Sequence, residues 1–287
     1  MSATPSYPPA SRKIMNVVML SLTGLCTLLV LSVLFTILGY LLWKGVHALN
    51  LNFFINLPAP VGESGGGVAN AIVGTLKLLG MATLIGVPIG LLGGIYLSEF
   101  AGGWSAFAVR YTTDLLNGVP SVVMGIFVYT LVVLPMHHFS TLAGGIALGI
   151  MMIPIALRST EDFLRAVPRS LREGGLALGA SKSETIFTIV IPAAIYGILT
   201  GVMLDIARVA GETAPLLFTA FGNQFNSPGW MQPTASLPVV IYNYAISPYD
   251  EWHQQAWAAG FVLLSGLLVV SILARMILAR GKKMSHG

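Results

Sequence analysis

The segment from residue 168 to residue 192 reads PRSLREGGLALGASKSETIFTIVIP. A proline opens it and a glycine follows its leucine-rich run, so we expect one short helix over residues 169–178. Ser181 and Glu184 form a capping box that starts a second helix, which the final proline either bounds or kinks. Two short helices on a basic loop predict a rigid projection, residues 169–187, which we call the knob. Its shape is suited to docking on another protein.

The chain on both sides of the knob has the composition of a membrane protein. Of its 287 residues, 55% are hydrophobic and 9% are charged, and the mean hydropathy is +0.81. These values argue against a soluble globular fold. We therefore expect an all-α integral membrane protein with six transmembrane helices, because six apolar segments approach or exceed the roughly 20 residues that cross a bilayer. The segments are residues 14–43, 69–97, 119–135, 142–157, 192–213 and 257–278.

Several of these spans contain pairs of glycines one helical turn apart. Small residues at this spacing let helix backbones approach closely, although glycine is also common in membrane helices for other reasons. A repeated pattern across consecutive spans favours a tight bundle over independent anchors. The pairs are Gly86/Gly90, Gly90/Gly94, Gly145/Gly149 and Gly197/Gly201.

The lysines and arginines fall on one side of the expected membrane. With the N-terminus inside the cell, the outer loops hold only Lys44, and the segment 214–256 holds neither lysine nor arginine. Because cytoplasmic segments carry an excess of these residues, we expect both termini in the cytoplasm. The basic balance, with a pI near 9.3, then reflects orientation and not nucleic-acid binding. The cytoplasmic set is Arg12, Lys13, Arg110, Arg158, Arg165, Arg169, Arg172, Lys182, Arg275, Arg280, Lys282 and Lys283.

Four ionisable residues fall inside the expected spans: Lys77 in the second, and Asp205, Arg208 and Glu212 in the fifth. Each costs about 2.5–3.5 kcal/mol at mid-bilayer, so each needs a partner or a wet cavity. On a continuous helix the three residues of the fifth span share one face, which is expected to meet Lys77. Two interpretations remain open. Either the charges neutralise one another and hold two helices in register, or the carboxylates position Arg208 to offer its guanidinium to a crossing anion. Which carboxylate pairs with Lys77 is open as well.

Motifs for catalysis and for nucleotide binding are missing from the sequence. There is no Gly-x-x-x-x-Gly-Lys-Ser/Thr loop to cradle nucleotide phosphates. The histidines lack the spacing of metal ligands on a helix, and no Ser-His-Asp or Cys-His set can be placed on facing elements. We expect no enzymatic activity and no cofactor bound by this chain.

The knob resembles the coupling motif of ABC-importer permeases, in which a glutamate, two alanines, a glycine and a later Ile-x-Leu-Pro recur. Glu173, Gly179, Ile189, Ile191 and Pro192 have this spacing. Four further stretches resemble the membrane subunits of the bacterial phosphate-specific transporter (Pst), the A subunit more than its C paralogue. They are residues 64–75, 116–129, 207–220 and 231–242.

The resemblance implies a type I ABC-importer permease that imports inorganic phosphate across the bacterial cytoplasmic membrane. Its partners would be a paralogous C-type permease, a homodimeric ATPase that holds ATP and magnesium, a periplasmic or surface-anchored phosphate-binding protein, and membrane lipid, with no nucleic acid. The residues for coupling to the ATPase would be Arg172, Glu173, Gly174, Gly175, Leu178, Gly179, Ala180, Ser181 and Lys182. The substrate path would be formed by Arg208, Glu212, Asp205 and Lys77.

The same resemblance divides the chain into a cytoplasmic tail (1–13), an additional N-terminal transmembrane helix (14–43), an outer loop (44–68), a permease core (69–280) with its coupling segment at 158–191, and a second cytoplasmic tail (281–287). One departure is that Gly174 and Gly175 replace the two alanines. Each glycine costs about 1 kcal/mol of helix propensity, which leaves open whether the knob helix is ordered before docking. Two alternative functions are a permease for another oxyanion, such as molybdate or sulfate, and a secondary transporter that works without ATP.

Overall fold

The computed structural model describes residues 10–60, 63 and 65–284, with side chains over residues 12–60, 63 and 65–276. Most of the expected N-terminal tail and the last three residues of the expected C-terminal tail lie outside the described residues, as does Ser64 at the start of one resembling stretch.

The described residues are helical and contain no β-strand. The all-α membrane fold expected from composition is therefore confirmed. The α-helices are α1 (Ala10–Ala48), α2 (Leu51–Ile55), α3 (Ala69–Ile95), α4 (Gly103–Gly118), α5 (Ser121–Val128), α6 (Leu134–Met136), α7 (Thr141–Arg165), α8 (Arg169–Ala177), α9 (Lys182–Thr185), α10 (Ile191–Val209), α11 (Ala214–Thr219), α12 (Leu237–Ala245) and α13 (Asp250–Met284). The π-helical turns are η1 (Tyr96–Phe100), η2 (Tyr129–Val133) and η3 (Ile186–Val190).

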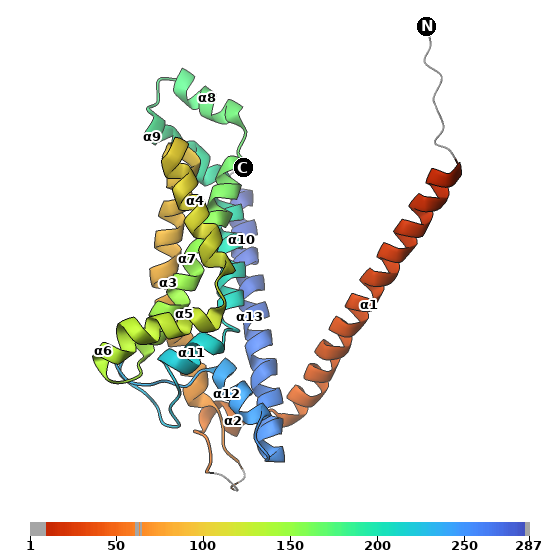
Figure 1. Ribbon diagram of the computed structural model, residues 1–287, viewed down its shortest axis with the longest axis vertical. Helices are drawn as coiled ribbons and strands as arrows, with labels where there is room; N and C mark the ends of the chain where they lie inside the picture. Colours follow the sequence, from red (N-terminus) through yellow and green to blue (C-terminus); the bar gives the residue numbers. More distant parts are fainter. Residues whose placement is uncertain (1–9, 61–62, 64, 285–287) are drawn as a thin grey trace.

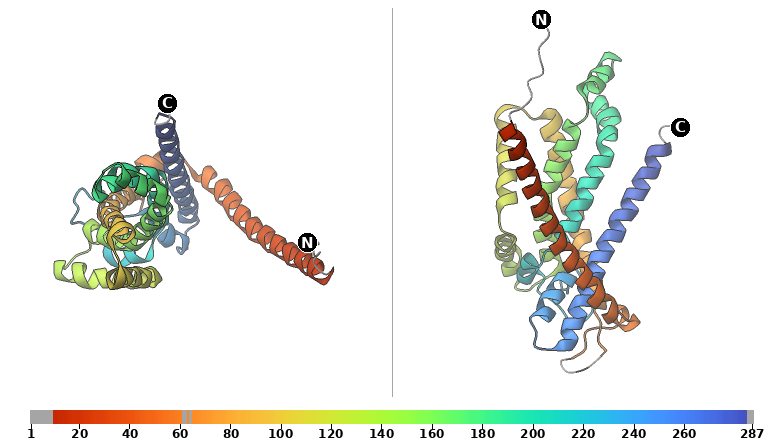
Figure 2. Two further views of the ribbon diagram at one scale, coloured as in Figure 1. Left: turned by 90° about the horizontal axis from the view of Figure 1, so that it is seen from above. Right: turned by 90° about the vertical axis from the view of Figure 1, so that its right-hand side faces the viewer.

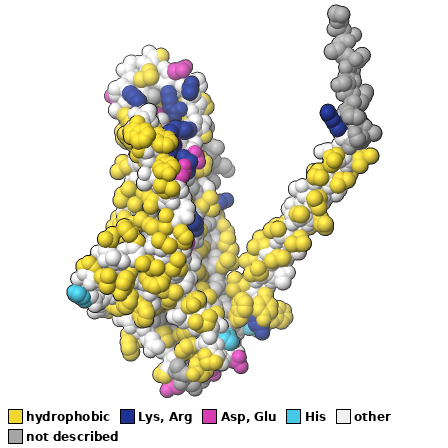
Figure 3. All heavy atoms as spheres, in the orientation of Figure 1, with side chains coloured by type: hydrophobic (Ala, Val, Ile, Leu, Met, Phe, Trp, Pro, Cys, Tyr) yellow, Lys and Arg dark blue, Asp and Glu magenta, His cyan; other side chains and the backbone are white. Residues whose placement is uncertain are grey.

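Apart from α1, the long helices run side by side along the longest axis of the molecule (Figure 1). Among the described residues, five helices are long and apolar enough to cross a membrane, and a bent pair makes six when it is counted as one span. Helices α8 and α9 lie at one end of the bundle, and α2, α11 and α12 lie at the other. We call these the α8 end and the α12 end. Lysine and arginine side chains gather at the α8 end, above a largely hydrophobic surface (Figure 3).

The third span differs from the prediction of a single helix over residues 119–135. It is built from Gly103–Gly118 and Ser121–Met136, which meet at an angle of 102°. Pro120 explains the break, because proline lacks an amide hydrogen and pushes the residue before it out of helical geometry. Val119 has the extended backbone, with φ −71° and ψ 127°, that this effect requires.

The fifth span also differs from its predicted boundaries of 192–213. The helical segment starts at Lys182, passes through the turn η3 and ends at Val209. Pro192 therefore neither ends the helix nor stands at its start, because a π-helical turn lies directly before it. Such turns absorb an interrupted hydrogen-bond ladder inside a helix.

Helices α3 and α7 form the centre of the bundle, and their glycines bring the two backbones together. A Cβ atom placed on Gly86 would lie 2.6 Å from the Cβ of Met152, and one on Gly94 would lie 2.6 Å from the Cβ of Thr160. Gly90 lies between them and meets Ala156 in the same way. The predicted close approach of glycine-bearing helices is confirmed at this interface.

Helix α1 stands apart from the bundle over most of its length (Figure 2). Every residue from position 12 to position 37 is exposed, whereas Gly45 is buried. A Cβ atom on Gly45 would lie 2.5 Å from the Cβ of Phe261 on α13. The ring of Tyr40 packs edge-on against Trp257, with the ring centroids 5.0 Å apart. Helix α1 is thus fastened to the bundle near the α12 end alone.

Candidate functional site

The first short helix that the sequence predicts for the knob is present, whereas the second, α9, is the first turn of the long helical segment that continues to Val209. The first, α8, follows Pro168 and ends at Ala177, one residue before the predicted boundary. Gly179 then turns the chain with φ +87°, a left-handed conformation that side-chain-bearing residues rarely adopt. The capping box is present: the Ser181 amide donates to Glu184 Oε2 at 2.7 Å, and the Glu184 amide donates to Ser181 Oγ at 3.3 Å.

The two glycines of the knob have different surroundings. A Cβ atom on Gly174 would have no heavy atom within 4 Å, whereas one on Gly175 would lie 2.9 Å from Cγ2 of Thr185 and 2.8 Å from Cδ1 of Ile189. Gly175 therefore lets α8 lie close to α9 and η3. At Gly174, by contrast, packing gives no reason for glycine in place of the alanine of the coupling motif.

The outer surface of the knob is apolar and uncovered. Leu178 is 90% exposed, and Leu171 and Leu176 are exposed as well. Glu173 is exposed on the same helix and, among the described residues, makes no hydrogen bond or ion pair. Ala180 is half-buried, and the ammonium of Lys182 lies 4.8 Å from the centroid of the Phe100 ring. Exposed leucines beside an exposed carboxylate are typical of a protein-docking surface.

Arg172 faces the other way. Its Nη1 donates to the carbonyl of Val167 at 2.7 Å, and its Nη2 donates to the carbonyl of Leu164 and to Glu99 Oε1, both at 2.8 Å. The Glu99 side chain is 6% exposed and also accepts a hydrogen bond from Ser98. A polar groove of about 660 Å³ lies beside these contacts, lined by Ser98, Glu99, Arg165, Arg169, Arg172 and Glu173.

A second ion-pair cluster at the α8 end is centred on Glu161, whose side chain is 1% exposed. Its Oε1 lies 2.8 Å from Arg110 Nε on α4 and 3.0 Å from Arg165 Nη2, and its Oε2 lies 3.6 Å from Arg158 Nη1. Arg158 also bonds Asp114 at 3.0 Å. Sequence reasoning used these arginines for orientation only and missed the carboxylate between them. The i, i+3 and i, i+4 spacing of Arg158, Glu161 and Arg165 was the available signal.

The intramembrane charges do not form the predicted pairs. Asp205 is buried on α10, and neither of its carboxylate oxygens has a hydrogen-bond partner within the described part of the chain. Arg208 lies one turn further along the same helix; it is exposed and makes no hydrogen bond or ion pair with any described residue. An exposed guanidinium in a membrane helix needs an anion, a partner subunit or water around it.

Glu212 is not on the helical face that the sequence predicted. Helix α10 ends at Val209, and the amides of Gly211 and Glu212 bond back to the carbonyls of Arg208 and Val209 at 3.2 and 3.1 Å. Gly211 and the following Pro215 explain the early end, because both residues disfavour a continuing helix. Glu212 is half-buried in the turn before α11.

Lys77 pairs with neither carboxylate among the described residues. Its Nζ donates to the carbonyl of Ser227 at 2.5 Å and lies 6.0 Å from the centroid of the Trp230 ring. Both partners belong to the segment between α11 and α12. Lys77 therefore fastens this segment to α3.

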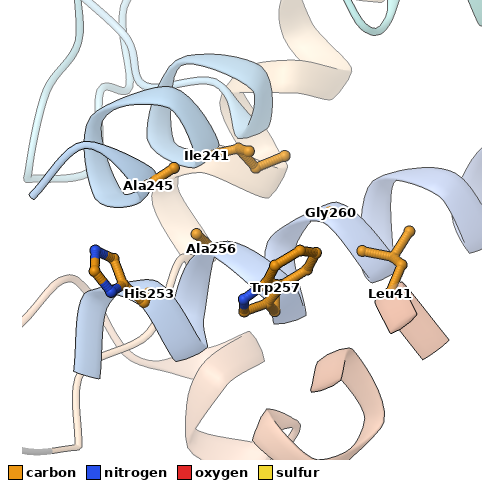
Figure 4. A pocket seen from close by; sticks show the side chains of 7 residues that line it. All are labelled: Leu41, Ile241, Ala245, His253, Ala256, Trp257 and Gly260. Atoms are coloured by element: carbon orange, nitrogen blue, oxygen red, sulfur yellow. The ribbon is translucent and has the colours of Figure 1, made fainter. Parts of the chain in front are cut away.

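Two cavities near the α12 end are uncharged. One, of about 370 Å³, lies where α12, α13 and α1 meet (Figure 4). His253 and Trp257 of α13 and Leu41 of α1 line it, together with small and aliphatic residues. The other, of about 450 Å³, is lined by amide and aromatic side chains that include Asn70, Asn223 and Asn243. Neither contains a cation that would hold an anion.

Comparison with known proteins places this geometry among transport proteins. A family model described as "Binding-protein-dependent transport system inner membrane component" matches residues 86–283. The chain is 46% identical over 264 residues to the phosphate transport system permease protein PstA of Yersinia pestis, covering 88% of this chain and 90% of that protein. It is 44% identical over 274 residues to the protein of the same name from Haemophilus influenzae, covering 94% and 96%.

Solved structures with a similar fold are also ABC transporters. A bacterial ABC transporter involved in the import of the acidic polysaccharide alginate matches with a TM-score of 0.61 at 16% identity, covering 93% of this chain and 99% of that chain. The inward-facing MetNI methionine ABC transporter matches with a TM-score of 0.53 at 17% identity, covering 75% and 92%. At these identities the likeness is one of fold.

Proposed function

The chain belongs to the family of binding-protein-dependent transport system inner membrane components, and we propose that it is the membrane-spanning permease subunit of an ATP-driven phosphate importer. The observation that carries this function is the identity of 46% and 44% to phosphate transport permeases over most of the chain. The chain is a transport subunit and not an enzyme.

The knob is the proposed docking site for the ATPase. Its exposed Leu178 and the unpaired Glu173 offer an apolar tip and a negative charge, and Gly179 sets the turn that presents them. Exposed apolar side chains that lie together mark protein-interaction sites, and a docked ATPase would cover Leu178. A homodimeric ATPase would then contact this chain and a second permease through equivalent knobs.

The second permease subunit is proposed to be a paralogous C-type chain. Support comes from α1, an apolar helix that is exposed from position 12 to position 37, and from Arg208, which is exposed and makes no hydrogen bond or ion pair with any described residue. Both features are accounted for when another bundle lies beside this one. A phosphate-binding protein would dock at the opposite, α12 end.

Arg208 is the proposed contact for the crossing anion. A guanidinium binds phosphate oxygens through two parallel hydrogen bonds, which an ammonium cannot match. Arg208 lies in the last turn of α10, directly before the turn that ends the helix. Asp205 lies one turn away and Glu212 four residues on, so both are proposed to orient it.

The α8 end is proposed to face the cytoplasm. Arg110, Arg158, Arg165 and Arg172 gather there with the knob, and cytoplasmic surfaces carry an excess of arginine and lysine. A reporter fused to the C-terminus should then be active only in the cytoplasm. An active reporter outside the cell would contradict this orientation.

The function is tested with the full complex in proteoliposomes, measuring ATP-dependent uptake of radiolabelled phosphate. We expect Arg208→Gln to assemble normally and to lower uptake by roughly 10- to 100-fold, because hydrogen bonds to charged groups are worth about 1.5–3 kcal/mol. Arg208→Lys, which keeps the charge and loses the planar fork, should recover only part of the activity. Lys44→Gln is the control, because it removes an exposed cation on α1, outside the proposed path.

Two results would contradict the proposal. Phosphate uptake by vesicles that lack the ATPase would indicate a secondary transporter. Uptake of molybdate or sulfate in preference to phosphate would assign the chain to another oxyanion. Normal uptake by Arg208→Gln would leave the importer assignment standing and remove Arg208 from the path.

A further inference from the structure

The contacts of Arg172 indicate a role that differs from docking. Although Arg172 lies on α8, its guanidinium is bonded to the bundle: to the carbonyls of Val167 and Leu164 at the end of α7, and to the carboxylate of Glu99 in η1. The turn η1 is the final part of the span that begins with α3. One side chain thus joins the knob to the ends of two spans.

The chemistry of the junction fits arginine alone. The last carbonyls of a helix lack partners within it and accept bonds from nearby side chains. Arg172 reaches the carbonyl of Leu164 in the last turn of α7, the carbonyl of Val167 in the connection after α7, and the carboxylate of Glu99, because its planar fork carries several donors in fixed directions. The Glu99 carboxylate is almost completely buried, so it depends on this partner for its charge to be tolerated.

Few other contacts hold α8 against the bundle. In the part of the chain that the structure describes, Arg172 makes the only hydrogen bonds from an α8 side chain to another element. The remaining attachments are the chain itself at both ends of α8 and the close packing of Gly175 on Thr185 and Ile189. Without Arg172, α8 is held by its chain connections to α7 and α9 and by the packing of Gly175, and within the described residues it has no polar link to the span that begins with α3.

The link matters because α3 and α7 form the glycine-packed centre of the bundle and α3 carries Lys77 toward the α12 end. If movement of the knob reaches the end of the span that begins with α3, it moves α3 and α7 together. If it does not, only the connections around α8 bend, and α3 and α7 stay in place.

We propose that Arg172 is a positioning residue that transmits movement of the knob to α3 through Glu99, and that it is not a contact for the ATPase. This inference rests on the proposed function, because it requires an ATPase at the knob. Loss of Arg172 therefore uncouples the two activities: the ATPase still binds and hydrolyses ATP, while phosphate transport falls.

The experiment measures ATP hydrolysis and phosphate uptake on the same proteoliposomes containing the full complex. For Arg172→Gln we expect hydrolysis within twofold of the unchanged complex and uptake at least tenfold lower. Glu99→Gln should give the same result, because it removes the same ion pair from the other side. Arg275→Gln, which removes an exposed arginine on α13, is the matched control and should leave both rates unchanged.

The outcomes separate this inference from the proposed function. If the unchanged complex shows no ATP-driven phosphate uptake, the proposed function is wrong. If it transports and Arg172→Gln transports equally well, Arg172 does not transmit movement. A parallel fall of hydrolysis and uptake in Arg172→Gln that Glu99→Gln does not share would instead make Arg172 an ATPase contact. Should Arg172→Gln fail to assemble, Arg172→Lys and Glu99→Gln take its place. The hydrolysis rate and the uptake rate of each variant, both relative to the unchanged complex, then decide in the same way.

Discussion

Replacing Glu161 with alanine should destabilise the protein more than any single change to the arginines around it. The Glu161 side chain is 1% exposed, whereas those of Arg110, Arg158 and Arg165 are 29%, 40% and 52% exposed. Removing one partner of a buried ion pair costs about 3–5 kcal/mol when the other stays buried. Here the arginines regain part of their hydration, so we expect the lower end of that range.

A loss of about 3 kcal/mol corresponds to a fall of roughly 6–12 °C in melting temperature, at about 2–4 °C per kcal/mol for a chain of this size. The measurement is thermal unfolding of the purified protein in nanodiscs. Arg165→Ala removes a half-exposed partner and should cost about 0–1 kcal/mol. Asp162→Ala is the control for charge, because Asp162 is exposed next to Glu161. The reasoning fails if Glu161→Ala melts within 2 °C (about 1 kcal/mol) of Asp162→Ala.

Two further changes test the packing of the knob and of the bundle. Gly174→Ala should stabilise α8 by about 1 kcal/mol and slow amide hydrogen exchange there roughly fivefold, since its Cβ meets open space; Gly175→Ala should gain nothing, because its Cβ meets the branched side chain of Thr185. Equal slowing in both variants would contradict this difference. Gly90→Leu should overpack the α3–α7 interface, cost about 3 kcal/mol or more and lower the folded yield in detergent. Gly80→Leu on the same helix is the control, because the structure leaves space for a side chain there. Similar yields of the two variants would show that α3 and α7 are not held at this distance.

Local rules predicted the parts of the fold that depend on local sequence. The proline before α8, the glycine after it and the Ser181–Glu184 capping box all act within one or two turns, and all are present as expected. The long apolar spans follow from hydropathy in the same way, since a bilayer fixes their length.

The sequence was less informative where a helix breaks or continues against its apolar pattern. Hydropathy placed the third span over residues 119–135, although Pro120 divides it and the charged helix α4 supplies the first half. It also carried the fifth span to residue 213, past the glycine that ends α10. Hydropathy averages over many residues, so it located neither the bend at Pro120 nor the end of α10 at Val209.

Charge pairing was the least predictable feature. The prediction that Asp205, Arg208 and Glu212 share one face assumed a helix that continues to residue 212. The prediction that Lys77 faces them assumed that its partner would be another side chain. The structure gives Lys77 the carbonyl of Ser227, some 150 residues away in sequence. The partners of Glu161 and Arg172 likewise come from separate helices, which only tertiary packing brings together.

The single attachment of α1 has a consequence for how such chains diversify. The family match begins at residue 86, beyond α1, and the buried contact at Gly45 involves one helix of the remainder. A leading segment that is held by one joint can be exchanged for that of a relative by recombination, with repacking at its contacts with α13. Natural hybrids of this kind would differ in their first membrane crossing while keeping the machinery behind it unaltered.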